Sequence, residues 1–399
     1  MKAIAQRLSL AQAASGLTSG VFTPFFGAWM AWRGLSPGQV ALVLSAALLL
    51  RALVTPASGI VADARNDRRE AMIALYVAAL VGYGVLVFVK TPLLVFLAAV
   101  PATVAYGSGV PLLESVSVRL SERYGFDYGR VRLFASFAFV VANILAGVSI
   151  SLWSMGVFPA CMAAGAALCL LSALALPAAI HQRGMLRLKL KATLGEAREL
   201  LRSPTFAIFL IATSLLQGSH AFYYGYGGLH WVSLGYSGAL IGILWPLGVF
   251  VEIALFSQSL RVSRLIGPMR LLLLGALGCV VRWTILAFDP PLPLVVFAQV
   301  LHGATFALPH LGAMYFILRA VPPRLAATAQ SLYFVCYAGL MMGVATYASG
   351  LLYAQVGGFA YLLMSAMGLG AMGFTLLLAR LWHGGRVVLV EGEEHLDTI

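Results

Sequence analysis

Long uninterrupted runs of apolar residues dominate the chain, and short segments that carry most of the charge separate them. A helix needs about 20 apolar residues to cross a hydrocarbon core roughly 30 Å thick. The runs do not alternate apolar and polar positions, so they predict helices that satisfy their own backbone in lipid. We predict twelve spans, at residues 10–32, 38–62, 70–89, 92–118, 130–153, 157–179, 205–230, 238–260, 269–288, 292–319, 325–353 and 357–381.

The composition agrees with this pattern. Of the 399 residues, 61% are hydrophobic and only 10% are charged, whereas a soluble domain carries about a quarter charged residues. We therefore expect an all-α, multi-pass protein of the lipid bilayer. The four cysteines lie in apolar runs without CxxC spacing, so they predict neither a disulfide framework nor a metal site. The weakly basic start shows no cleavage site, and we expect it to remain as the first helix.

The net charge of +12 follows the predicted topology. With a cytoplasmic N-terminus and twelve spans, both termini are cytoplasmic. All but four of the 26 Lys and Arg residues then lie on the cytoplasmic side. Arg33 and Lys90 fall outside, and Arg51 and Arg282 fall within spans. This is the positive-inside pattern, which explains the basic balance without a nucleic-acid partner.

The longest connection divides the spans into two sets of six. We predict a six-helix bundle over residues 1–180 and a second, pseudo-symmetric bundle over 205–385. The connection itself, 181–204, is basic and partly amphipathic, which favours a helix at the cytoplasmic interface. Residues 386–399 form a short acidic tail.

Several ionisable side chains lie within the predicted spans, where inserting a charge costs free energy. One at the bilayer centre costs about 2.5–3.5 kcal/mol on insertion scales, so it usually faces the bundle interior and has a function. Glu252, Arg282 and His302 lie near the middle of three neighbouring spans, while Arg51 and His220 lie mid-span elsewhere. Burial and a nearby arginine shift a carboxyl in opposite directions, and histidine titrates near neutral pH unaided. This set therefore predicts proton coupling.

Other groups allow more than one interpretation. The stretch LHGATFALPH carries His302 and His310 about 80° apart around a helix, so both can face one cavity, and Pro309 can open backbone groups to it. Glu114 and Arg132 lie toward the cytoplasmic ends of successive spans and can meet. Structural ion pairs and satisfied core histidines are the alternatives.

Aromatic residues gather near the predicted midplane. Tyr223 and Tyr224 follow His220 closely, and Phe26 and Phe139 lie in the first and fifth spans. Together they could form an apolar slot for a flat substrate. An interfacial aromatic belt is the alternative for the tyrosines.

Two six-helix halves joined by a charged linker resemble the plan of major facilitator transporters, whose binding site lies between the halves. The loop GIVADARNDRR after the second span resembles the short signature of that superfamily, a glycine, an aspartate and a basic cluster. The resemblance implies a gating role for the matching residues, which are Gly59, Asp63, Arg65, Arg68 and Arg69.

A closer resemblance covers nearly the whole chain. FDYGRVRLFASFAF (126–139) and the constellation of Glu252, Arg282 and His302 resemble lactose-permease-type sugar/proton symporters, where these positions serve proton coupling. Seven blocks in order, among them PLLES (111–115) and LLQGSHAFYYGY (215–226), resemble the bacterial 3-phenylpropionate/proton symporters more closely.

The departures from the sugar symporters are informative. The sugar symporters carry a carboxylate at the position where this chain has Thr305. This difference points to Glu252 as the proton carrier and His302 as its modulator. The same symporters carry a sugar-stacking tryptophan where this chain has Phe139, and a phenyl ring suits an aromatic acid.

We therefore predict a proton-coupled symporter of the bacterial inner membrane that imports a small aromatic monocarboxylate, such as 3-phenylpropionate, by alternating access. We expect a monomer that uses the proton as coupling ion and needs no cofactor. The residues predicted for proton coupling are Glu252, His302, Arg282 and Glu114. Those predicted for the organic anion are Arg132, Arg51, Glu114, His220, Tyr223, Tyr224, Phe139, Phe26, His310 and Thr305.

Three alternatives remain open. A sugar or nucleoside symporter of the same fold is supported by the Glu114 and Arg132 pair. An efflux antiporter shares most of these features, since direction is not visible in the sequence. A membrane enzyme or sensor is disfavoured because the chain shows no nucleophile elbow, HExxH cluster, phosphate loop or signalling domain.

Overall fold

The computed structural model describes residues 2–65, 67–177 and 186–388, and this part of the chain is helical with no strand. Within the described residues, each of the twelve predicted spans lies largely on helical segments. Residues 178 and 179 of the span predicted at 157–179 lie outside them. The helices before the linker are α1 (Lys2–Trp32), α2 (Pro37–Arg65), α3 (Arg68–Leu86), α4 (Pro92–Tyr124), α5 (Tyr128–Leu152), the turn η1 (Met155–Val157) and α6 (Phe158–Ala175).

The predicted interfacial helix of the linker corresponds to α7 (Leu186–Leu201), and residues 178–185 lie outside the described part. The helices after it are α8 (Pro204–Gly218), η2 (Tyr223–Gly227), α9 (Gly228–Ser233), α10 (Gly238–Ser257), α11 (Ser259–Ile266), α12 (Pro268–Ala287), α13 (Leu292–Val300), η3 (Gly303–Ala307), α14 (Leu308–Ala320), η4 (Pro323–Leu325), α15 (Ala326–Phe334), η5 (Val335–Met341), α16 (Met342–Val356), η6 (Gly357–Ala360) and α17 (Tyr361–Leu381). Of the predicted acidic tail, residues 389–399 lie outside the described part.

Within the described residues, ten helical stretches are long and apolar enough to cross a membrane. The chain is thus a multi-pass membrane protein. α1 is not among the ten, because serine, threonine and glycine residues dilute its apolar run. One stretch, Pro323–Leu381, is 59 residues long, which is enough for two crossings. Twelve crossings and cytoplasmic termini stay predictions.

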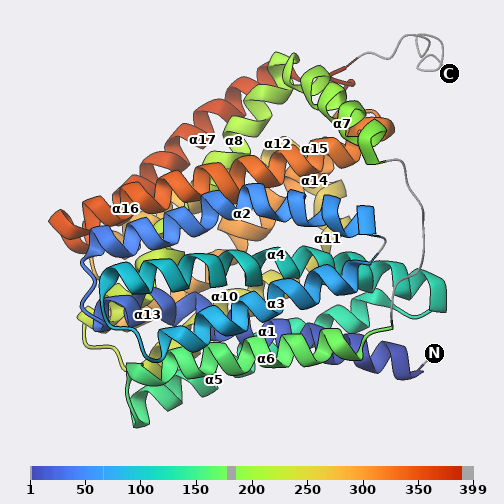
Figure 1. The fold of residues 1–399 in the computed structure, drawn as a ribbon. Helices are drawn as coiled ribbons and strands as arrows, with labels where there is room; N and C mark the ends of the chain where they lie inside the picture. The colour runs from blue at the N-terminus through green and yellow to red at the C-terminus, as the bar shows by residue number, and fades with distance from the viewer. Residues whose placement is uncertain (1, 66, 178–185, 389–399) are drawn as a thin grey trace. The chain divides into compact units, whose positions relative to one another are not determined.

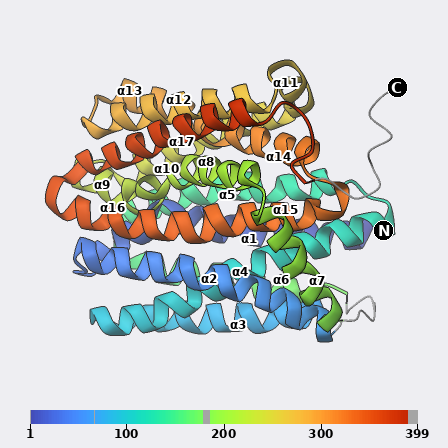
Figure 2. The same cartoon turned by 90° about the horizontal axis from the view of Figure 1, so that it is seen from above.

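Contacts group the chain into two compact units. The first contains Met1–Leu186, Ala221–Leu247 and Thr346–Gly357, and the second contains the remaining residues. In the first unit α1 packs against α5 and α6 (Figure 1). In the second, α12 packs against α14 and α17, and α17 also packs against α8 (Figure 2). The predicted division into two six-helix bundles stays a prediction.

A wide helical turn positions the central side chains of the second unit. Between α13 and α14 the backbone forms the π-helical turn η3, and the Leu308 N–H donates to the Gly303 carbonyl five residues earlier. Pro309 follows directly; proline has no N–H and crowds the carbonyl of the residue four positions before it, which the wider turn relieves. Gly275 on α12 leaves room for the proline ring, since a Cβ there would overlap its Cγ atom.

Candidate functional site

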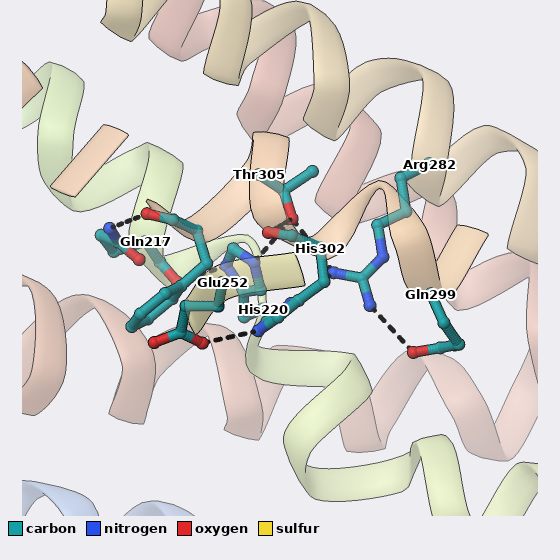
Figure 3. A network of polar contacts seen from close by, with 8 residues as sticks. Gln217, His220, Glu252, Arg282, Gln299, His302 and Thr305 are labelled. Atoms are coloured by element: carbon teal, nitrogen blue, oxygen red, sulfur yellow. Dashed lines mark hydrogen bonds and ion pairs between the residues drawn. The ribbon is translucent and has the colours of Figure 1, made fainter. Parts of the chain in front are cut away.

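Three helical segments bring an acid, an imidazole and a guanidinium together in the second unit. Glu252 lies on α10, His302 at the start of the wide turn and Arg282 on α12. Glu252 Oε2 lies 3.6 Å from His302 Nε2, and Arg282 Nη1 lies 2.9 Å from His302 Nδ1 (Figure 3). The structure thus places the three residues predicted for proton coupling in one chain of contacts, with the imidazole in the middle.

Arg282 is completely buried, and its surroundings hold it in one orientation. Nη1 also donates to Thr305 Oγ1 at 3.0 Å, and Nη2 donates to Gln299 Oε1 at 3.3 Å. The guanidinium carbon lies 4.4 Å from the centre of the Trp283 ring, a cation–π contact that suits a desolvated arginine.

Two of these partners, Gln299 and Trp283, are not predicted from the sequence. Gln299 precedes His302 by three positions, so the two lie on one helix face. An isolated amide side chain in an apolar run was the feature of the sequence that could have indicated Gln299 as a site residue. Trp283 follows Arg282 directly in VVRW, but only packing shows that its ring turns back onto the guanidinium.

The arginine fixes the tautomer of His302. A guanidinium only donates hydrogen bonds, so Nδ1 of His302 must accept, and the ring proton of the neutral imidazole lies on Nε2. That N–H faces Glu252. The 3.6 Å distance to Glu252 Oε2 is longer than an ordinary hydrogen bond. Arg282 also donates to Thr305 and Gln299, neither of which changes its charge.

His220 joins the same network from the C-terminal end of α8. Its Nε2 lies 3.1 Å from Thr305 Oγ1, and its Nδ1 lies 3.1 Å from the Gln217 carbonyl oxygen (Figure 3). The ring is completely buried and meets the His302 ring edge-on at 5.5 Å. Thr305, which replaces the carboxylate of the sugar symporters, therefore connects His220 to Arg282.

The two histidines of LHGATFALPH are linked by an aromatic ring. Phe306 stacks on His302 at 5.5 Å and on His310 at 6.3 Å between ring centres. His310 also packs against Phe256 and Tyr333. The two histidines thus lie on one helix face with Phe306 stacked between them. That both face one cavity stays a prediction. Among the described residues, no group of three His, Cys, Asp or Glu side chains could hold a metal ion.

One close approach fixes the position of the imidazole. Gly248 on α10 lies against His302, and a Cβ at this glycine would be 2.8 Å from the Cβ of His302. Only a residue without a side chain lets α10 come this near. The same helix carries Glu252, one turn later, so the glycine brings the acid within reach of the imidazole.

A second acid–base cluster lies in the first unit. Arg132 Nε is 2.8 Å from Glu114 Oε1, so the predicted pair does meet. Tyr128 donates a short bond of 2.5 Å to the other carboxylate oxygen, and Gln12 donates to it at 3.2 Å. Gln12 also donates to Ser117. The sequence analysis missed Tyr128 and Gln12, although Tyr128 stands four residues before Arg132, one helical turn away.

Arg51, the other arginine predicted within a span, lies on α2 against α4. Its side chain fills the space next to Gly107, where an added Cβ would be 2.6 Å from Arg51 Cδ. The pair Thr55 and Ser108, one turn further along both helices, is joined by a 3.0 Å hydrogen bond. This helix contact leaves Arg51 partly exposed.

The predicted aromatic residues occupy separate places within the first unit. Tyr223 is buried and stacks on Trp245 at 4.3 Å, with Tyr224 at 5.6 Å. Phe26 is buried and stacks on Phe158. Phe139 is partly exposed on α5. Tyr223 and Phe26 are therefore packed into aromatic clusters, and a single slot lined by all four residues stays a prediction.

The loop with the predicted gating signature has a clear helix-capping role. Arg69 donates to the carbonyl oxygens of Ala173 at 3.2 Å and Leu174 at 2.6 Å, which lie at the end of α6. Asp67 caps α3 by accepting from the N–H groups of Arg69 and Glu70. Arg68 is partly exposed, and Gly59 has open space beside it. The side chains of Asp63 and Arg65 lie outside the described residues.

The fold and these clusters define a helical membrane transporter. Residues 17–363 match the MFS_1 like family, and the chain belongs to that family of major facilitator transporters. The "Probable 3-phenylpropionic acid transporter" of Escherichia coli (strain K12) is 31% identical over 356 residues, which cover 88% of this chain and 92% of that protein.

Other relatives extend the comparison. Maltose permease of Geobacillus stearothermophilus is 31% identical over 274 residues, which cover 68% of each chain. The crystal structure of the nucleoside transporter NupG superposes with a TM-score of 0.81 over 94% of this chain and 99% of that chain, at 18% identity. At that identity the likeness concerns the fold alone. The family and these relatives are transporters, so the chain is expected to move a small molecule across a lipid bilayer.

Proposed function

We propose that the protein is a proton-coupled symporter that imports a small aromatic monocarboxylate, of the 3-phenylpropionate class, across the bacterial inner membrane. The observation that carries the coupling is the placement of the His302 imidazole between Glu252 and the buried Arg282. The name of the E. coli relative supports the substrate class, and its bacterial source supports the inner membrane as the location. We expect a monomer without a cofactor.

Charge accounting links the proton to the anion. With Glu252 ionised, its negative charge balances the positive charge of Arg282, and the cluster is neutral. With Glu252 protonated, the cluster carries one net positive charge in a poorly solvated site, which attracts a carboxylate. Binding of the anion in turn favours the protonated acid, because linkage between two ligands is reciprocal. The proton and the acid are therefore carried together.

The roles of the individual residues follow from this cycle. Glu252 takes up the proton from outside, and His302, which contacts both Glu252 and Arg282, links the proton site to the arginine. Arg282 supplies the permanent charge, and its planar fork suits a carboxylate. Glu114, in contrast, contacts Arg132 directly, and we assign that pair the ion-pair role that the sequence left open.

Uptake by proteoliposomes tests the proposal. Labelled 3-phenylpropionate should accumulate inside when the outside is made acidic, and the accumulation should disappear when a protonophore collapses the gradient. Equal accumulation with and without the protonophore would rule out proton coupling. No saturable uptake of 3-phenylpropionate or related aromatic acids would rule out the substrate class.

Sugar uptake is the second candidate, because maltose permease is 31% identical over 68% of the chain. A nucleoside is the other substrate class that the sequence left open for this fold. A thermal-shift screen separates them, since a ligand that binds only the folded protein raises its apparent stability. We expect aromatic acids to raise the unfolding temperature, and sugars and nucleosides to leave it unchanged. The opposite result would favour the second candidate.

A further inference from the structure

The hydroxyl group of Thr305 sits at a point where hydrogen-bond partners compete. A threonine hydroxyl has one hydrogen to donate and two lone pairs. Arg282 Nη1 lies 3.0 Å away and only donates, so it takes one lone pair. The single hydrogen can then point to the His302 carbonyl oxygen at 3.2 Å or to His220 Nε2 at 3.1 Å.

The other ring nitrogen of His220 has no such choice. Its Nδ1 lies 3.1 Å from the Gln217 carbonyl oxygen, which only accepts. Nδ1 therefore carries a hydrogen whichever way Thr305 points. A buried polar group without a partner costs about 1–3 kcal/mol, and this geometry avoids that penalty at Nδ1.

Two arrangements satisfy every atom of this junction. In the first, His220 is neutral, and Thr305 donates its hydrogen to Nε2. In the second, His220 has gained a proton at Nε2 and donates it to Thr305 Oγ1, while the threonine hydrogen turns to the His302 carbonyl. The change requires one added proton and one hydroxyl rotation, and no helix needs to move.

We propose that His220 is a second proton-holding residue of the transporter, and that the Thr305 hydroxyl is the switch that accommodates both of its protonation states. This deepens the proposed proton coupling and rests on it. The proton comes from water and binds at Nε2, which adds one positive charge next to Arg282. A nearby negative charge, on ionised Glu252 or on the bound carboxylate, stabilises that form.

Charged and titratable groups of the second unit lie next to His220. Arg282 and His302 face it directly, and Glu252 acts through His302. Trp283 meets its ring edge-on at 5.2 Å and donates from the indole N–H to Ser219. The other titratable side chains on elements packed against α8 are Arg270 and Cys279 on α12, His310, Tyr315 and Arg319 on α14, Tyr333 on α15, Cys336 and Tyr337 on η5, and Tyr361 and Arg380 on α17.

Nitrogen-15 NMR of the full-length protein in lipid nanodiscs, labelled at histidine, tests the proposal. The variant His220→Gln identifies the His220 signals among those of the seven histidines. As the pH is lowered stepwise from about pH 8 to below the range in which a free histidine changes charge, we expect these signals to convert from the neutral form with a proton on Nδ1 to the imidazolium form. Adding 3-phenylpropionate should move the conversion to higher pH.

Two variants of Thr305 separate a switch from a structural role. Thr305→Ser keeps the hydroxyl and should titrate as the wild type does. Thr305→Val keeps the shape but offers no acceptor to a protonated Nε2, so its His220 should stay neutral over the same range. A wild-type His220 that stays neutral throughout, with and without 3-phenylpropionate, would overturn the proposal. So would a Thr305→Val variant that titrates like the wild type.

The outcomes distinguish this inference from the proposed function. If His220 titrates but 3-phenylpropionate has no effect and is not transported, the substrate is wrong and the proton-holding role stands. If 3-phenylpropionate is transported with its proton while His220 never titrates, the proposed function stands and the second proton-holding residue does not exist.

Discussion

The two acid–base clusters of the molecule use the same residue types in opposite ways. In the first unit the Glu114 carboxylate contacts the Arg132 guanidinium at 2.8 Å and also accepts from Tyr128 and Gln12. In the second unit a histidine lies between Glu252 and Arg282, and its distance to the acid is 3.6 Å. Glu114 therefore has three side-chain donors, whereas Glu252 contacts an imidazole that Arg282 also contacts.

The proposed function gives the two clusters different roles: Glu114 and Arg132 form a fixed charge pair, and Glu252 takes up and releases the proton. Removing one partner of a charge pair leaves the other without its counter-charge. In the second unit the imidazole contacts both the acid and the guanidinium, so a change at Glu252 acts on all three groups. We therefore expect variants of the two clusters to differ in transport, and not only in stability.

The largest expected effect is at Glu252. Glu252→Gln keeps the size of the side chain but cannot take up a proton, so gradient-driven accumulation should be lost. For one proton per substrate, that is about a tenfold loss in accumulation per pH unit of gradient. Exchange of labelled for unlabelled 3-phenylpropionate at equal pH should persist, which is measured in the same proteoliposomes. Glu114→Gln is the matched control and should still accumulate substrate.

A smaller effect is expected from filling the close approach between α10 and His302. Gly248→Ala places a methyl group within 2.8 Å of the His302 Cβ, and overpacking of this kind costs about 1–3 kcal/mol. We expect a lower unfolding temperature and weaker proton-driven accumulation. Gly373→Ala on α17 is the control, since a Cβ there meets no atom within 4 Å. Equal behaviour of the two variants would contradict the packing argument.

Loss of the Glu114 ion pair should affect stability modestly. Both side chains are partly exposed, so the pair and its two extra donors contribute about 1–2 kcal/mol together. Glu114→Gln and Arg132→Gln should each destabilise, and the double variant should lose less than the sum. Strictly additive losses in chemical denaturation would show that the contact contributes nothing.

The smallest effect concerns the helix of the linker. Glu199 on α7 pairs with Arg324, and this bond lowers the pKa of Glu199. A lowered pKa means that the pair stabilises the protein above the ordinary carboxyl range and loses this contribution as the pH falls through the lowered value. Glu199→Gln should therefore unfold at a slightly lower temperature near neutral pH, and the difference should vanish in acid.

Much of the fold was predictable, because spans in lipid follow from apolar run length alone. Within the described residues, each predicted span is largely helical. The prediction did not include the wide turn at Gly303–Ala307, although Pro309 pointed to an irregular backbone there. Nor did it separate α1 from the more apolar helices. Such features depend on local hydrogen bonding and packing, which hydropathy does not record.

The candidate site was predictable in part for the same reason. Glu252, Arg282 and His302 stand out because charge within a span is rare, and the structure brings them together. Gln299, Trp283 and Gly248 do not stand out, because amides, indoles and glycines are common in membrane helices. Their importance comes from where neighbouring helices place them, and that requires the tertiary structure.

The most direct test of the central claim is the proton movement that accompanies transport. Unbuffered proteoliposomes are given 3-phenylpropionate at equal pH on both sides, and a pH electrode records the external medium. The wild-type protein should make the medium more alkaline as the acid enters with its proton, and Glu252→Gln should not. Substrate entry without alkalinisation in the wild type, or alkalinisation that Glu252→Gln leaves intact, would contradict the account.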